Sequence, residues 1–245
     1  MKHLKMLIAS SMVIAMCLSL TTPAFAVQVN NQETAIIAAE ECIDFVEQEL
    51  SSQHTDVISG LAEYRAMLQD LLKSCTNEED VVKIKDLINS VDKLTSSYIA
   101  YKNGARSTKG VFAAAIGAIS IYFQGRNDWL ASELLIHAAN NPTLDSTYVP
   151  INVDKIKSSK TWNTVRTGSG SSGSGTFKMS ESEDLYYAIN KFSWTRTSQR
   201  LKFEDRYDFA PGDYSGLADT AVNAMYYAQQ AGELVPFYVI FYEQV

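Results

Sequence analysis

The densest group of reactive side chains in the chain is the run from Glu204 to Phe209, which reads Glu-Asp-Arg-Tyr-Asp-Phe. Two carboxylates this close could divide general acid and general base work between them, or could hold a cation. On a strand, Asp205 and Tyr207 would face one side, whereas Arg206 and Asp208 would face the other. The alternative is an Arg206–Asp208 ion pair on a solvated face, which is the usual role of such charge clusters.

His137 is a further catalytic candidate because it follows Glu133 by one helical turn, a spacing compatible with metal binding. A zinc site needs at least three protein ligands, and His54 is far away in sequence. A capping or packing role near a helix C-terminus is therefore favoured for His137. We expect no metal site and no cofactor. The sequence also lacks a phosphate-binding loop and a strand-to-helix G-x-S-x-G turn.

Tyrosine is abundant, with 13 residues in the chain, and most lie in the C-terminal half. A tyrosine side chain offers apolar area together with a hydroxyl group, which suits recognition of peptides and sugars and equally suits a small core. The binding candidates are three of these tyrosines, Tyr207, Tyr186 and Tyr214, together with Arg206 next to Tyr207.

The elements that position these residues change in character near residue 142. Residues 27–142 show apolar side chains three and four positions apart, the spacing of amphipathic helices in a bundle. The most apolar stretch, 111–123, contains one hydroxyl residue, Ser120. A buried central helix explains this stretch, and a membrane-inserting element is the alternative. As a helix it would cover about 20 Å, short of the ~30 Å hydrocarbon core.

Residues 143–245 predict a small α+β domain, so the fold class is α+β with an N-terminal helical bundle. Its elements are an antiparallel hairpin, one helix and a final strand, with two earlier strand candidates. The Gly/Ser-rich segment 168–175 is predicted to be a flexible linker or a hairpin loop. The predicted strands are 148–153, 162–165, 185–195, 201–209 and 235–242, and the helix is 217–231.

The N-terminus has the features of a secretory signal peptide. Lys2 and Lys5 precede the apolar stretch 6–20, and Ala24 to Ala26 form an A-x-A cleavage site. We expect cleavage after Ala26 and secretion of residues 27–245. This product has 19 basic and 28 acidic residues, a net charge of −9, which excludes a phosphate-dependent nucleic-acid binder.

Cys42 and Cys75 would be the cysteines of the secreted protein, and export favours a disulfide. If their helices form a hairpin turning near His54, the two residues are offset by roughly 13 Å, which is beyond disulfide reach. Two free thiols are the alternative that this geometry favours.

The C-terminal half resembles uncharacterised small secreted proteins of Gram-positive bacteria. The resemblance rests on the D-R-Y-D-F strand at 205–209 and on a following helix of the form M-Y-x-A-Q-x-A-G, residues 225–232. The helix A-S-E-L-L-I-H-A, residues 131–138, is also similar to that group. No activity carries over from it, so the resemblance implies export from a Gram-positive cell.

No complete catalytic set emerges, so we favour a secreted, non-enzymatic binding protein. Its partner would be a protein, peptide or glycan at the cell surface or outside the cell, not a nucleic acid. The first alternative is a membrane-active, toxin-like protein that uses segment 111–123. The second is a secreted hydrolase centred on Asp205 and Asp208, with His137 as a possible third member.

Overall fold

The structure, a computed structural model, describes residues 24–52, 56–140, 142–210 and 217–244. Its contacts divide the chain into two compact units, residues 1–35 and 36–245. Apart from residues 24–26, the predicted signal peptide lies outside the described residues. All contacts given below lie within residues 36–245.

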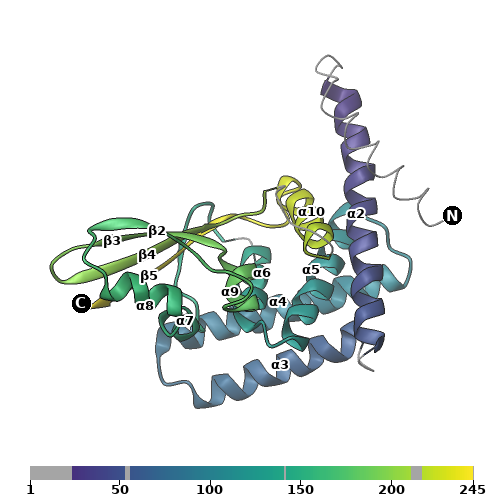
Figure 1. Ribbon diagram of the computed structural model, residues 1–245. Coiled ribbons are helices and arrows are strands. Elements are labelled where there is room, and N and C mark those ends of the chain that lie inside the picture. The colour runs from purple at the N-terminus through teal and green to yellow at the C-terminus, as the bar shows by residue number, and fades with distance from the viewer. Residues whose placement is uncertain (1–23, 53–55, 141, 211–216, 245) are drawn as a thin grey trace. The chain divides into compact units, whose positions relative to one another are not determined.

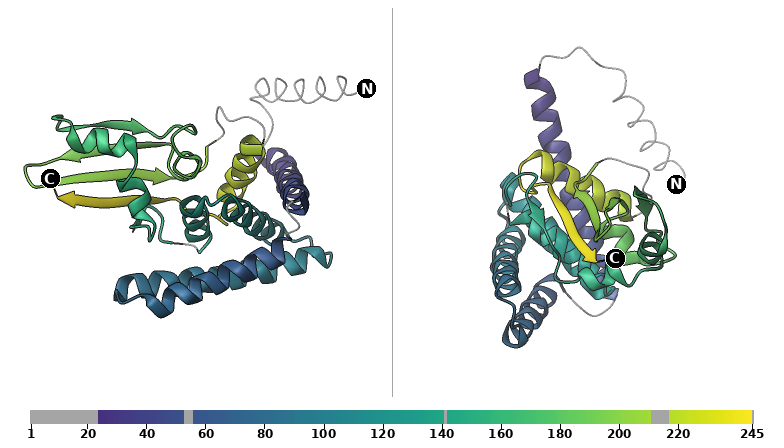
Figure 2. Two further views of the ribbon diagram at one scale, coloured as in Figure 1. Left: turned by 60° about the horizontal axis from the view of Figure 1, so that its bottom comes forward. Right: turned by 90° about the vertical axis from the view of Figure 1, so that its left-hand side faces the viewer.

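The N-terminal half is helical, as its periodicity predicts (Figure 1). Its helices are α2 (Ala24–Ser52), α3 (Val57–Ser74), α4 (Glu78–Lys102), α5 (Thr108–Gly125) and α6 (Trp129–Ala139). Helices α3 and α4 pack side by side, as Figure 2 shows. Ion pairs join α2 to the end of α4 and the segment after it, with Glu47 3.0 Å from Lys102 and Glu40 3.2 Å from Arg106.

Helix α5 contains the apolar segment 111–123 and is the central helix of the bundle. It contacts α3, α4, α6 and α10 (Leu217–Gln230), and most of its side chains are buried. The Ser120 hydroxyl donates a hydrogen bond to the Ile116 carbonyl at 2.8 Å, so its polar group is satisfied inside the bundle. The prediction of a core helix is therefore confirmed. Among the described helices, none combines the length and apolar character that crossing a bilayer requires.

The C-terminal half forms a five-stranded mixed sheet with the order β1-β5-β4-β3-β2. The strands are β1 (Thr147–Tyr148), β2 (Ser172–Thr176), β3 (Lys191–Arg196), β4 (Arg200–Tyr207) and β5 (Phe237–Gln244). β1 is parallel to β5, and the other pairs are antiparallel. The predicted hairpin, helix and final strand are β3–β4, α10 and β5. Helices and sheet belong to one compact unit, residues 36–245.

An aromatic cluster forms the core beneath this sheet. Trp162 is fully buried, with its ring edge-on to Phe203 and Phe241 at centroid distances of 5.6 and 5.3 Å. Segment 162–165 was predicted to be a strand, but it belongs to helix α8 (Lys160–Thr167). The Ser159 hydroxyl caps this helix by accepting a hydrogen bond from the Trp162 backbone at 3.1 Å. Capping and tryptophan burial thus outweigh the strand preference of these residues.

Two other strand predictions were too long. In segment 148–153, Tyr148 ends β1, residues 149–152 belong to no strand or helix, and Val153 begins helix α7 (Val153–Lys157). In segment 185–195, helix α9 (Glu183–Ala188) precedes β3, because the Ser182 hydroxyl caps the helix on the Leu185 N–H at 3.3 Å. Asn190 then adopts a left-handed conformation, with φ of 55°, where the chain turns from α9 into β3.

The Gly/Ser-rich segment was predicted to be a linker or loop at 168–175, but residues 172–176 form the edge strand β2. Gly175 lies opposite Phe192 of β3, and Gly173 lies opposite Trp194. A Cβ atom on Gly175 would come within 2.2 Å of the Phe192 ring, and one on Gly173 within 2.9 Å of Trp194. The glycines leave room for the aromatic rings of the neighbouring strand, which the composition of the segment does not reveal.

Cys42 and Cys75 are both free, in agreement with the helical geometry. Cys42 is buried, and this burial raises the pKa of its thiol to about 12. A thiol that stays protonated is a poor nucleophile, so Cys42 serves as an apolar core residue.

Candidate functional site

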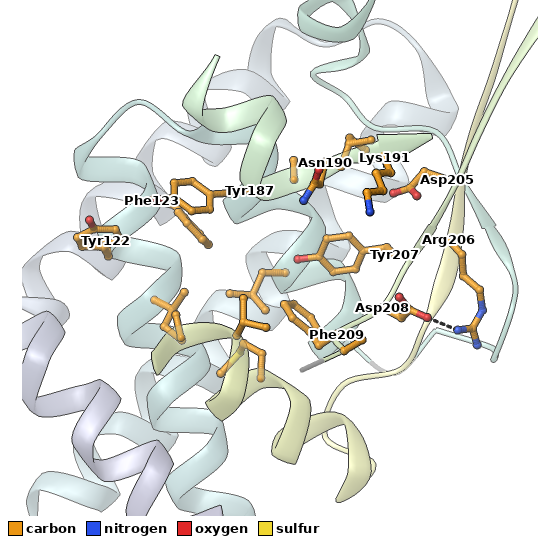
Figure 3. Close-up of a pocket in the computed structure, with 18 of the residues that line it drawn as sticks. Tyr122, Phe123, Tyr187, Asn190, Lys191, Asp205, Arg206, Tyr207, Asp208 and Phe209 are labelled. Carbon is orange, nitrogen blue, oxygen red and sulfur yellow. Dashed lines mark hydrogen bonds and ion pairs between the residues drawn. The ribbon is translucent and has the colours of Figure 1, made fainter. Parts of the chain in front are cut away.

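A cavity of about 260 Å³ lies where the end of β4 meets α5, α9 and α10 (Figure 3). Its volume is just below the ~300 Å³ at which typical ligand pockets begin, so it suits a small ligand. Polar residues gather on one side of it and aromatic rings line much of the rest. The polar lining residues are Asn190, Lys191, Asp205, Arg206 and Asp208, and the aromatic ones are Tyr122, Phe123, Tyr187, Tyr207 and Phe209.

Side-chain contacts fix the walls of this cavity. The Phe209 N–H donates to Gln229 Oε1 at 2.9 Å, and Gln229 Nε2 donates back to the Phe209 carbonyl at 3.2 Å. This pair of hydrogen bonds holds α10 against the segment that leaves β4. On the opposite wall, Phe123 of α5 packs on Tyr187 of α9 with ring centroids 5.5 Å apart. The cavity therefore has a braced frame on two sides.

Asp205 is the charged residue on the inward-facing row of β4. Leu201, Phe203 and Tyr207 share this row and are buried, and Asp205 itself is half-buried. Burial, and then the charge of Asp208, raise the pKa of the Asp205 carboxyl well above its usual range, against the lowering effect of the Arg206 backbone N–H. No described side chain forms an ion pair with Asp205.

Three other carboxylates among the described residues are more deeply buried than Asp205. One of them, Asp128, lies at the start of α6 and does not line the cavity, and the other two have full sets of partners. Glu133 accepts hydrogen bonds from the Tyr148 hydroxyl at 2.9 Å, the Ile151 N–H at 2.6 Å and the Asn152 side chain at 2.8 Å. Asp184 accepts from two backbone N–H groups at the start of α6 and lies 2.6 Å from the Lys155 ammonium. Glu133 and Asp184 therefore hold structural elements together. Asp205 differs from them because its hydrogen-bond donor is the backbone N–H of its neighbour Arg206, and no described side chain forms an ion pair with it.

Arg206 and Asp208 form the ion pair that the sequence predicts. Figure 3 shows the Arg206–Asp208 contact. Arg206 also lies 3.0 Å from Asp145 Oδ1, so its guanidinium is held between two carboxylates. Strand alternation placed Asp208 on the face opposite Asp205, but β4 ends at Tyr207 and Asp208 lines the same cavity. The structure thus brings four predicted residues together: Asp205, Arg206, Tyr207 and Asp208.

The remaining candidates lie elsewhere. The His137 ring stacks on Tyr148 at a centroid distance of 3.8 Å and meets Phe237 edge-on at 4.6 Å. Burial, and then the charge of Lys83, lower the pKa of His137 to about 4. His137 does not line the cavity, and its contacts agree with the packing role favoured above. Tyr186 contacts the Tyr187 ring at 5.4 Å without lining the cavity, and Tyr214 lies outside the described residues.

Sequence reasoning missed the residues contributed by other elements: Asn190, Lys191, Tyr187, Tyr122 and Phe123. Tyr122 and Phe123 lie at the end of the apolar segment 111–123, where aromatic residues replace the small ones. This change from small to aromatic residues was the available signal that the end of the helix lines a cavity rather than packs against another helix. The Asn190–Lys191 pair gave no signal because segment 185–195 was predicted to be one strand.

The arrangement is suited to binding an amphipathic ligand. The cavity combines apolar and aromatic walls with a few polar groups on one side, which is the usual composition of small-molecule sites. Within the described ranges, no three His, Cys, Asp or Glu side chains lie close enough together to hold a metal ion.

Comparison of the chain with protein-family models, curated proteins and solved structures gives no match.

Proposed function

We propose that this protein is a secreted, non-enzymatic binding protein that takes its ligand in the cavity at the end of β4. The observation that carries the proposal is the Asp205 carboxyl, which faces a cavity with aromatic walls and has no ion-pair partner among the described residues. A half-buried charge without a structural partner lowers stability, and ligand recognition is a common reason for retaining such a group.

A fragment screen by ligand-observed NMR with residues 27–245 tests this function. Ala210 is exposed and lines the cavity, so Ala210→Trp should block it without overpacking the core. Ala231 is an exposed alanine that does not line the cavity, so Ala231→Trp is the matched control. Fragments should bind the wild type and the control and should lose binding to Ala210→Trp. Binding that survives in Ala210→Trp, or a screen without any binder, would contradict the proposal.

Secretion is the part of the proposal that rests on the N-terminal sequence and on the resemblance to Gram-positive secreted proteins. Expression of the full chain in a Gram-positive host should release a protein whose first residue is Val27. Mass spectrometry of the culture medium measures this start directly. A full-length protein retained in cells would count against export.

A hydrolase is a second candidate, because Asp205 and Asp208 line one cavity in different surroundings. A carboxyl with a raised pKa can act as a general acid, and a second carboxyl group in the same cavity can act as the base. The ion pair between Asp208 and Arg206 weakens this reading, since it occupies the potential base. If Asp205→Asn and Asp208→Asn leave every detected hydrolytic activity intact, the hydrolase candidate fails.

A membrane-active role is a third candidate, motivated by the apolar character of α5. It would require α5 to leave the bundle, where Gly117 approaches Leu94 and Leu61 of its neighbours. Dye release from liposomes by residues 27–245, abolished by Gly117→Asp, would support this role. Liposomes that stay intact at neutral and mildly acidic pH would leave α5 as a core helix.

A further inference from the structure

We propose that the cavity binds a small organic amine in its ammonium form, with the ammonium at Asp205 and an apolar body between the aromatic side chains. This inference rests on the proposed function, since it names the class of ligand for the same cavity.

The charges around the cavity favour a cation. Two carboxylates, Asp205 and Asp208, line it. The guanidinium of Arg206 already pairs with Asp208 and Asp145, and no ion pair joins it to Asp205. Lys191 lines the cavity from β3, but its side chain is exposed and lies outside the ion-pair distance of Asp205. An incoming ammonium would supply the counter-charge that Asp205 lacks among the described residues.

The ionisable groups on the other walls of the cavity add no charge to it. Tyr187 of α9 and Tyr122 of α5 both have a raised pKa, chiefly because of burial, and are therefore neutral at physiological pH. The lining residues of α10 are Ala221, Val222 and Met225, which carry no charge. Asp205 is thus the one half-buried charged group that faces the cavity from these described walls.

The aromatic residues fit the rest of such a ligand. Tyr207 and Phe209 pack edge-to-face with ring centroids 5.3 Å apart, and Phe123 packs on Tyr187 across the cavity. Aromatic rings attract organic cations through their π-faces and bury apolar groups. The cavity volume of about 260 Å³ suits a free small amine rather than an amine group of a protein or peptide.

Proton linkage gives the inference a second consequence. In the protein alone, burial raises the pKa of Asp205. A bound ammonium favours the ionised carboxylate, so binding below that pKa releases a proton. The affinity for an ammonium should therefore rise with pH, whereas the affinity for a neutral analogue should stay constant.

Isothermal titration calorimetry with three matched probes tests the charge preference: 2-phenylethylammonium, 2-phenylethanol and 3-phenylpropanoate. The wild type should bind the ammonium about tenfold more tightly than the alcohol, or better, and should bind the carboxylate most weakly. Asp205→Asn should bind the ammonium and the alcohol with similar affinities, and its affinity for the alcohol should stay close to that of the wild type. Glu204→Gln is the control, because Glu204 does not line the cavity and pairs with Lys202 on the strand.

Each outcome bears on one proposal. Equal binding of ammonium and alcohol by the wild type, or tightest binding of the carboxylate, overturns the amine inference and leaves the binding function standing. The amine inference is also overturned, and the binding function stands, if none of the three probes binds while other fragments bind the wild type and do not bind Ala210→Trp. A cavity that binds no fragment overturns both. If Asp205→Asn fails to fold, the wild type decides at pH 7: an order of affinities other than ammonium above alcohol above carboxylate contradicts the inference.

Discussion

Replacing Asp128 by asparagine should stabilise the protein at neutral pH. Asp128 immediately precedes α6, and its buried side chain makes no capping hydrogen bond. Its Oδ2 atom has no hydrogen-bond partner, and its closest ion pair, with Arg126 Nε, is long at 3.8 Å. The N-terminus of α6 is capped instead by Asp184. Burial, and then the charges of Asp184 and Glu183, raise the pKa of Asp128 to about 6.

The size of the effect follows from this pKa. A rise from 3.8 to about 6 corresponds to about 3 kcal/mol between the two protonation states. The folded protein holds the proton more tightly than the unfolded chain. The stability that this contributes is present below pH ~4 and is lost as the pH rises through about 6. Asparagine stays neutral, so the free energy of unfolding of Asp128→Asn should gain about 3 kcal/mol over that of the wild type between pH 4 and 7.

Urea denaturation of both proteins at pH 4, 5, 6 and 7, followed by circular dichroism, measures this difference. Titration of the groups that do not interact with Asp128 is common to both proteins and cancels in the comparison. Asp154→Asn is the control, because it makes the same substitution at a side chain that is 95% exposed. A difference for Asp128→Asn that is flat with pH, or that favours the wild type at pH 7, would refute the reasoning.

Three further changes test other parts of the structure. Asp184→Ala should lower the free energy of unfolding by about 3–5 kcal/mol, since it leaves two buried backbone N–H groups at the start of α6 without an acceptor and the half-buried Lys155 ammonium without its partner; chemical denaturation measures the loss. Gly175→Val should destabilise the protein by about 1–3 kcal/mol through its clash with Phe192, whereas the exposed Ser174→Val should not, as thermal denaturation would show. Burial lowers the pKa of His137 to about 4, so the free energy of unfolding should fall as the pH drops from 6.5 through 4. Denaturation between pH 7 and 4 should show this loss, up to about 3 kcal/mol, in the wild type. His137→Phe should not show it.

Regular periodicity was the part of the sequence that predicted structure well. Ile43, Val46 and Leu50, chosen from their helical spacing, are at most 2% exposed, because one face of an amphipathic helix must be covered. The hairpin β3–β4 and strand β5 were predicted from their aromatic and β-branched residues, and helix α10 was predicted with Gly232 as its C-terminal cap. The failures came where a single tertiary contact decides: Trp162 is helical because its ring fills the core beneath the sheet.

The sequence predicted the site residues at the end of β4 and none of those that the other elements contribute. Alternation along β4 correctly put Asp205 and Tyr207 on one face, and a carboxylate in a row of otherwise apolar and aromatic side chains was the signal for a cavity. Which helices close that cavity depends on α5, α9 and α10 meeting in space. No local pattern encodes that meeting, so residues such as Tyr187 could not be chosen in advance.

The buried carboxylates also separate structural constraint from binding. Removing Glu133 or Asp184 should loosen an element, because each holds backbone donors that would otherwise stay unpaired. Removing the charge of Asp205 should do the opposite, because the raised pKa of its carboxyl means that stability is lost as the pH rises through that pKa. A substitution that raises stability at neutral pH and removes discrimination between ligands is the behaviour expected of a site retained for function rather than folding. Measuring both properties on Asp205→Asn therefore distinguishes a binding site from a packing defect, since a packing defect would change stability alone.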